Sequence, residues 1–199
     1  MESKGPWTTV EAMRLAYQRR LALGMPQHVL FHYQSHAQYV AKLAAYSNRL
    51  QILGHSVGRL LDVGCGSGEL LRYYEPLEGY LGIDVVPGFI DYARTRFPDY
   101  SFQCADILRT SVEEKFDTVV MVGLLGRSPH PLPLVSTAAR LAQSHLVFDF
   151  LGDEGSAHAV AHLRTLSRHS VLKVVRDVGL RVVEEAQLGT STRIVTASQ

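Results

Sequence analysis

Three glycines alternate with small residues in LLDVGCGSGELL, residues 60–71, directly after a short apolar run. Gly64, Gly66 and Gly68 permit backbone conformations closed to other residues and let a ligand come close to the main chain. Both a nucleotide-binding loop and a tight structural turn without a ligand need this conformational freedom of glycine. The spacing is G-x-G-x-G rather than the G-x-G-x-x-G of dinucleotide-binding loops, and Asp62 precedes it. An acid there opposes a pyrophosphate and favours a cationic ligand group.

Two further acids lie near the ends of the next apolar runs. Asp84 in GYLGIDV comes twenty residues after Gly64, where an acid accepts hydrogen bonds from the hydroxyls of a nucleoside ribose. A helix cap is the structural alternative for Asp84. Asp106 in CADIL is placed to accept a hydrogen bond from an adenine amino group. Because ligands of open α/β sheets bind at the carboxyl ends of the strands, these acids and the glycine loop are expected to line one pocket.

The elements that position these residues alternate between short strands and helical patterns from residue 59 onward. Continuous apolar runs such as FDTVVMV fit strands of a sheet that is covered on both faces. The alternation itself implies parallel strands joined by right-handed crossovers. A closing strand pair follows around Gly189. The pattern therefore predicts an α/β fold, and residues 58–199 are expected to form that domain.

The residues before position 58 show helical patterns without intervening strands. A capping box from Thr8 to Glu11 begins a first helix that stops at Gly24, and a second helix is predicted from about Gln27 to Leu53. We expect residues 1–57 to form an N-terminal helical extension or cap within one compact domain. This segment holds six Lys and Arg against Glu2 and Glu11, which favours either an acidic substrate or an ordinary solvated helix face.

Composition excludes several classes of partner. The chain has 199 residues, 46% of them hydrophobic and 20% charged, as in ordinary globular proteins. It has no apolar stretch of the roughly 18 residues that span a bilayer and no signal-peptide pattern, so a cytoplasmic location without membrane association is expected. A net charge of +1 without a basic stripe argues against nucleic acid. His158 and His162 have a spacing that could suit a metal, but no third ligand is apparent, so no metal is predicted.

Taken together, LLDVGCGSG, GIDVV, QCADIL and FDTVVMVGLL resemble the class I S-adenosylmethionine-dependent methyltransferases over about residues 58–151. The resemblance implies a Rossmann-like, doubly wound α/β sheet of seven strands, mostly parallel with an antiparallel last strand, preceded by N-terminal helices. It also implies S-adenosyl-L-methionine as the cofactor. The binding residues that it implies are Asp62, Gly64, Cys65 and Gly66 for the methionine part, Asp84 for the ribose, Val85, Ala105, Asp106 and Ile107 for the adenine, and Gly123 and Leu124 near the sulfonium.

Methyl transfer needs an oriented acceptor more than a catalytic triad, because the cofactor carries most of the activation. His130 in GRSPHP, after the fourth strand, is the candidate catalytic residue, with plain loop exposure as the alternative. Tyr33 and His36 are candidates for the substrate pocket, and an amphipathic helix packed on the sheet is the alternative for them.

The predicted function is methyl transfer to an oxygen or nitrogen atom of a small molecule. GLLGRSPHP differs from the N/D-P-P-Y/F motif of enzymes that methylate nucleobase amino groups. A methyltransferase for a protein or RNA, or a non-catalytic cofactor-binding regulatory subunit, is the alternative. The sequence leaves the acceptor and the oligomeric state open.

Overall fold

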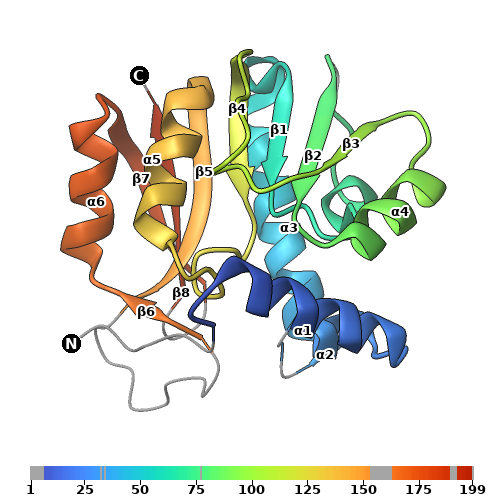
Figure 1. Cartoon of the computed structure of the whole chain (residues 1–199). Coiled ribbons are helices and arrows are strands. Elements are labelled where there is room, and N and C mark those ends of the chain that lie inside the picture. Colours follow the sequence, from blue (N-terminus) through green and yellow to red (C-terminus); the bar gives the residue numbers. More distant parts are fainter. Residues whose placement is uncertain are drawn as a thin grey trace.

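A computed structural model describes residues 7–31, 33, 35–76, 78–152, 163–188 and 192–198. Its centre is a sheet with helices on both faces (Figure 1). The strands are β1 Leu60–Val63, β2 Tyr80–Asp84, β3 Ser101–Cys104, β4 Phe116–Met121, β5 Ala142–Gly152, β6 Thr165–Leu166, β7 Arg181–Leu188 and β8 Thr192–Ser198.

The strand order is β3-β2-β1-β4-β5-β8-β7, and the short β6 pairs with β5 outside this path. Every pairing among β1 to β6 is parallel, whereas β8 is antiparallel to both β5 and β7. The predicted seven-stranded, mostly parallel sheet with an antiparallel last strand is confirmed, with the two-residue β6 as an addition. The order reverses between β1 and β4, and in open α/β sheets ligands bind beside such a switch point.

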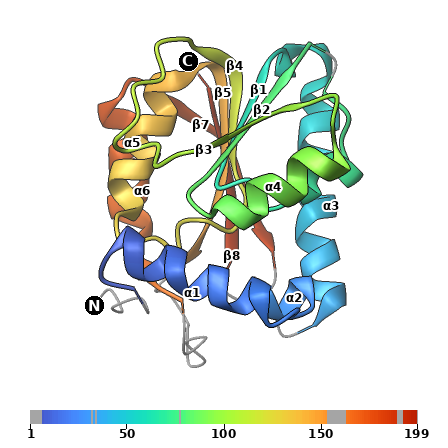
Figure 2. The same cartoon turned by 45° about the vertical axis from the view of Figure 1, so that its right-hand side comes forward.

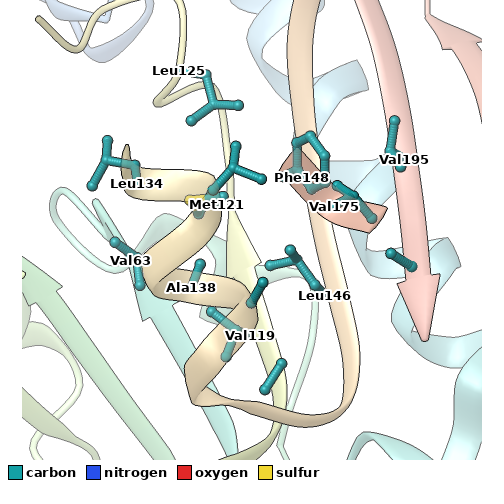
Figure 3. Packing of buried hydrophobic residues seen from close by; sticks show 14 of the residues in the cluster. Val63, Val119, Met121, Leu125, Leu134, Ala138, Leu146, Phe148, Val175 and Val195 are labelled. Carbon is teal, nitrogen blue, oxygen red and sulfur yellow. The ribbon is translucent and has the colours of Figure 1, made fainter. Parts of the chain in front are cut away.

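Helices α3 His36–Leu53 and α4 Pro87–Arg96 cover one face of the sheet, and α5 Pro131–Leu141 and α6 Arg168–Asp177 cover the other (Figure 1). Side chains of a strand alternate between faces. In β1, Leu60 accordingly packs with the α3 and α4 residues, and Leu61 packs with those of α5 and α6. Figure 3 shows the α5 and α6 side, where Val119, Met121 and Leu146 of the sheet meet Ala138 and Val175 of the helices.

The N-terminal helices α1 Val10–Ala22 and α2 Gln27–Leu30 lie across the edge where the parallel strands end (Figure 2). Met13 and Tyr17 of α1 pack with Val86 and Phe89, which lie just after β2. By contrast, Tyr46 of α3 is fully buried in the core of the sheet domain. We therefore propose that α1 and α2 form the cap, and that α3 belongs with the sheet rather than with an extension of residues 1–57.

Three local predictions are corrected by the structure. The single helix predicted over residues 27–53 is interrupted, because Ser35 has an extended backbone and its hydroxyl accepts a hydrogen bond from Gln38 N, which starts α3 anew. Thr9, rather than Thr8, caps α1 by accepting from Ala12 N at 3.1 Å. The alternation of strands and helical patterns from residue 59 onward implies a helix after the glycine loop, but this segment forms only a 3-10 turn, Glu69–Arg72.

Candidate functional site

A cavity of about 1040 Å³, counting the part open to solvent, lies at the carboxyl ends of β1, β2 and β4. All eleven residues expected to bind the cofactor line this cavity, together with Tyr33. These eleven are Asp62, Gly64, Cys65, Gly66, Asp84, Val85, Ala105, Asp106, Ile107, Gly123 and Leu124.

The glycine loop requires glycine both for its backbone and for its space. Gly64 and Gly66 have φ values of +74° and +55°, which side chains rarely adopt. A Cβ at Gly64 would lie 2.9 Å from a methyl carbon of Leu124, and one at Gly66 would lie 3.0 Å from the ring of Phe31. The main chain of the loop therefore forms the cavity wall directly.

Asp84 is held at the end of β2 by backbone donors. Its two carboxylate oxygens accept from Gly66 N and Val86 N, each at 2.9 Å. Burial raises the pKa of Asp84 to about 6, and the surrounding backbone N–H groups oppose this shift. The carboxylate keeps capacity for further donors, as a ribose-binding acid requires.

Asp62 has one carboxylate oxygen without a hydrogen-bond partner among the described residues. The other oxygen accepts from the Tyr80 hydroxyl at 2.9 Å, and the residue is only 1% exposed. Burial raises the pKa of Asp62 to about 7, although the Tyr80 hydrogen bond opposes it. Because buried polar groups normally find partners, the free oxygen fits a cationic donor supplied by a ligand.

Cys65 lies in the same loop but is not activated. Burial raises the pKa of its thiol well above the ordinary value, so the reactive thiolate is suppressed. The residue serves as a small, buried member of the turn.

A second wall of the cavity contains Arg127, a charged residue that the sequence analysis did not single out. The Arg127 guanidinium donates to the carbonyl oxygens of Gly123 and Phe31, and its central carbon lies 5.2 Å from the ring centroid of Tyr33. On the same ring, Lys42 Nζ lies 5.6 Å from the centroid. The signal in the sequence is a lone charge in the apolar stretch GLLGR.

Asp149, in the second half of β5, binds the backbone of Gly123. It accepts from Lys42 Nζ at 2.6 Å, from the Tyr46 hydroxyl at 2.7 Å and from Gly123 N at 2.5 Å. Burial by itself raises the pKa of Asp149, but the Lys42 charge and these hydrogen bonds hold it below the usual range. Asp149 is therefore an ionised anchor between α3 and the end of β4.

The two histidine candidates do not line the cavity. His130 is exposed at the residue before α5, where Pro131 starts the helix, and its backbone N donates to Ser128 Oγ. His36 is exposed at the first residue of α3, and its ring lies 6.1 Å from that of His28. The expectation that His130 and His36 face an acceptor is therefore not supported, and their assigned roles remain predictions.

Within the described residues, no group of three or more His, Cys, Asp or Glu side chains could hold a metal ion. His158 and His162 lie outside the described residues. None of the described helices combines the length and hydropathy needed to cross a membrane.

The fold and the cavity define an α/β protein with an acid-lined ligand site at the switch point of its sheet. A family model described as a methyltransferase domain matches residues 61–145. Phosphatidylethanolamine N-methyltransferase of Cereibacter sphaeroides is 30% identical over 150 residues, which cover 66% of this chain and 74% of that protein. The chain belongs to the S-adenosylmethionine-dependent methyltransferase family, whose cofactor is S-adenosylmethionine.

Other curated relatives match a smaller part of this chain, and a solved structure of low sequence identity shows only the same fold. Malonyl-[acyl-carrier protein] O-methyltransferase of Acetivibrio thermocellus is 35% identical over 94 residues, 44% of this chain and 33% of that protein. The chain spans about a third of the length of three curated relatives that it matches. Magnesium protoporphyrin IX methyltransferase from Synechocystis with bound S-adenosylhomocysteine superimposes with a TM-score of 0.78 at 17% identity, covering 96% of this chain and 100% of that one.

Proposed function

We propose that this chain binds S-adenosylmethionine in the cavity and transfers its methyl group to an oxygen or nitrogen atom of a small molecule. The observation that carries the proposal is the convergence of all eleven expected cofactor residues on one cavity at the sheet switch point. Relatives named trans-aconitate 2-methyltransferase, phosphatidylethanolamine N-methyltransferase and ubiquinone biosynthesis O-methyltransferase support the choice of acceptor class. The predicted cytoplasmic location stays a prediction.

The residues of the cavity fit the groups of this cofactor. The unpartnered oxygen of Asp62 suits the ammonium group, and the carboxylate of Asp84 suits the ribose hydroxyls. Asp106, whose Oδ1 accepts from Leu108 N at 3.0 Å, suits the adenine amino group. The open main chain at Gly64 and Gly66 lets the methionine part approach closely.

Bound S-adenosylmethionine supplies an electrophilic methyl group on a sulfonium. The contribution of the chain is orientation and exclusion of water. Phe31 and Tyr39 stack with ring centroids 5.8 Å apart in the cavity wall, and Tyr17 of α1 packs 5.8 Å from Phe89. Holding two reactants in line can lower a barrier by about 7–11 kcal/mol, so this arrangement can act without a catalytic triad.

Calorimetric titration tests the cofactor site first. We expect micromolar binding of S-adenosylhomocysteine and S-adenosylmethionine and no binding of NAD. Asp84→Asn is expected to weaken S-adenosylhomocysteine binding at least tenfold, because one ribose-facing acceptor becomes an amide donor. The matched control is Asp91→Asn, at a carboxylate 75% exposed on α4, which should bind like the wild type.

Absence of binding by any adenosyl compound would contradict the proposed function. Unchanged affinity in Asp84→Asn would contradict the assignment of the ribose site alone. Once binding is established, a screen of small hydroxyl, carboxyl and amino compounds with labelled cofactor identifies the acceptor.

A further inference from the structure

Arg127 is a buried guanidinium at the cavity wall. The residue is 9% exposed and lines the cavity, and it has no carboxylate within ion-pair distance among the described residues. Its two terminal nitrogens donate to the carbonyl oxygens of Gly123 and Phe31. Its Nε is buried and has no hydrogen-bond partner among the described residues. Because buried charges are normally paired, the free Nε donor of this guanidinium has the capacity to bind an anionic group.

The charges around Arg127 leave a positive excess at this wall. Lys42 is already neutralised by Asp149 at 2.6 Å, and Asp149 is further committed to Tyr46 and Gly123 N. Arg127 then has no ion-paired carboxylate of its own among the described residues, although Asp149 lies near enough to stabilise its charge and the ring of Tyr33 covers it. One unit of positive charge matches a carboxylate better than a phosphate monoester, which carries a charge of about −1.5 to −2 near neutral pH.

This wall differs from the one that suits the cofactor. The carboxylates that fit the ammonium and hydroxyl groups of the cofactor, Asp62 and Asp84, belong to β1 and β2. Arg127 follows β4, and it contacts Phe31 in the segment between α2 and α3. A guanidinium pairs well with a carboxylate because its N–H groups form a planar fork of matching geometry.

We infer that Arg127, with Tyr33 covering it, forms a carboxylate-binding corner of the acceptor site, so that the methyl acceptor of this chain carries a carboxylate group. This inference rests on the proposed function, since it names the acceptor class of the same cavity. The methionine part of the cofactor also carries a carboxylate that could pair with Arg127. The test therefore distinguishes this cofactor carboxylate from a carboxylate of the acceptor.

The first arm compares cofactor fragments. S-adenosylhomocysteine and 5′-methylthioadenosine, which lacks the amino-acid part, are titrated into the wild type, Arg127→Gln and Arg127→Lys. We expect both compounds to bind each variant within threefold of the wild type. If Arg127→Gln weakens S-adenosylhomocysteine at least tenfold and leaves 5′-methylthioadenosine unchanged, the corner binds the cofactor carboxylate, and the inference is overturned.

The second arm probes the acceptor site directly. The protein saturated with S-adenosylhomocysteine is titrated with matched pairs of carboxylic acids and their primary amides, drawn from aliphatic monoacids, diacids and aromatic acids. In the wild type we expect at least one acid to bind tenfold tighter than its amide. Arg127→Gln should abolish that preference and Arg127→Lys should reduce it at least threefold. Arg176→Gln, a change at an exposed arginine of α6, should retain it.

A wild type that prefers no acid, or a preference that survives in Arg127→Gln, overturns the inference. If Arg127→Gln does not fold, the wild-type preference and its reduction in Arg127→Lys decide the matter. A wild type that fails to bind S-adenosylhomocysteine contradicts the proposed function instead, so the two failures are distinguishable.

Discussion

At the scale of single residues, three carboxylates in or beside the cavity differ in their hydrogen-bond partners. Asp149 is surrounded by three donors and stays ionised, whereas Asp62 has one hydroxyl donor and a free oxygen. Asp84 has an intermediate number of donors, two backbone N–H groups, and burial raises its pKa to about 6. The Lys42 charge together with the number of donors thus distinguishes the structural anchor, Asp149, from the acids that can receive a ligand group.

Asp62 is expected to make the ligand-free protein less stable as the pH rises. Its carboxyl titrates near 3.8 when unfolded and at about 7 when folded, so between these values the folded chain holds a proton that the unfolded chain has lost. The free energy of unfolding therefore falls from about pH 4 to pH 7 and then levels. Asp62→Asn should reduce the difference in unfolding free energy between pH 5 and pH 8 by on the order of 2 kcal/mol.

Urea denaturation at the two pH values checks this expectation. Asp99→Asn, at an exposed position after α4, is the control and should keep the wild-type difference. A pH dependence identical in Asp62→Asn and the wild type would show that the Asp62 carboxyl is already ionised in the folded protein at pH 5.

At the scale of elements, α3 is joined to the sheet by a polar anchor inside an apolar interface. The Tyr46 hydroxyl lies 2.7 Å from both Asp149 Oδ1 and the carbonyl oxygen of Met121, and Lys42 approaches from one turn earlier on the helix. Gly123 N donates to the same Asp149 oxygen. The position of α3 is therefore coupled to the loop after β4 that lines the cavity.

Tyr46→Phe should lower the free energy of unfolding by about 1–3 kcal/mol, because it removes the buried hydroxyl donor that Asp149 Oδ1 and the Met121 carbonyl oxygen share. Urea denaturation measures the change. Tyr92→Phe removes a hydroxyl from a side chain 45% exposed on α4 and should have little effect. Equal stability of the two variants would mean that apolar packing alone holds α3 in place.

At the scale of the whole molecule, β5 joins the parallel half of the sheet to the antiparallel pair. It pairs with β4 on one side and with β8 on the other, and its side chains enter the cores on both faces. Leu146, in the cluster of Figure 3, is fully buried between the sheet and its helices.

Leu146→Ala is expected to lower the free energy of unfolding by about 2–5 kcal/mol through lost burial and a residual cavity. Ile52→Ala, at a side chain 74% exposed near the end of α3, should change it by less than about 0.5 kcal/mol. Chemical denaturation of both variants measures this contrast. A loss below about 1 kcal/mol in Leu146→Ala would contradict the packing of β5 described above.

The sequence by itself determined the sheet and the acidic wall of the cavity. Short apolar runs alternating with helices imply parallel strands, and parallel strands place their carboxyl ends at one edge. Asp84 therefore meets the glycine loop, and Gly66 N donates to it at 2.9 Å across eighteen residues of sequence. These features are local patterns whose spatial consequence is fixed by the rules of strand pairing.

Only the tertiary structure decided the basic wall. Arg127 reaches Phe31 across 96 residues, and Lys42 reaches Asp149 across 107 residues. The break between α2 and α3, which places Phe31 and Tyr33 over the cavity, interrupts what the sequence presents as one helix. Such long-range contacts leave no periodic pattern in the sequence, because they depend on which helix packs over which strand end. The sequence thus defined where a cofactor fits, and the fold defined which charges face it.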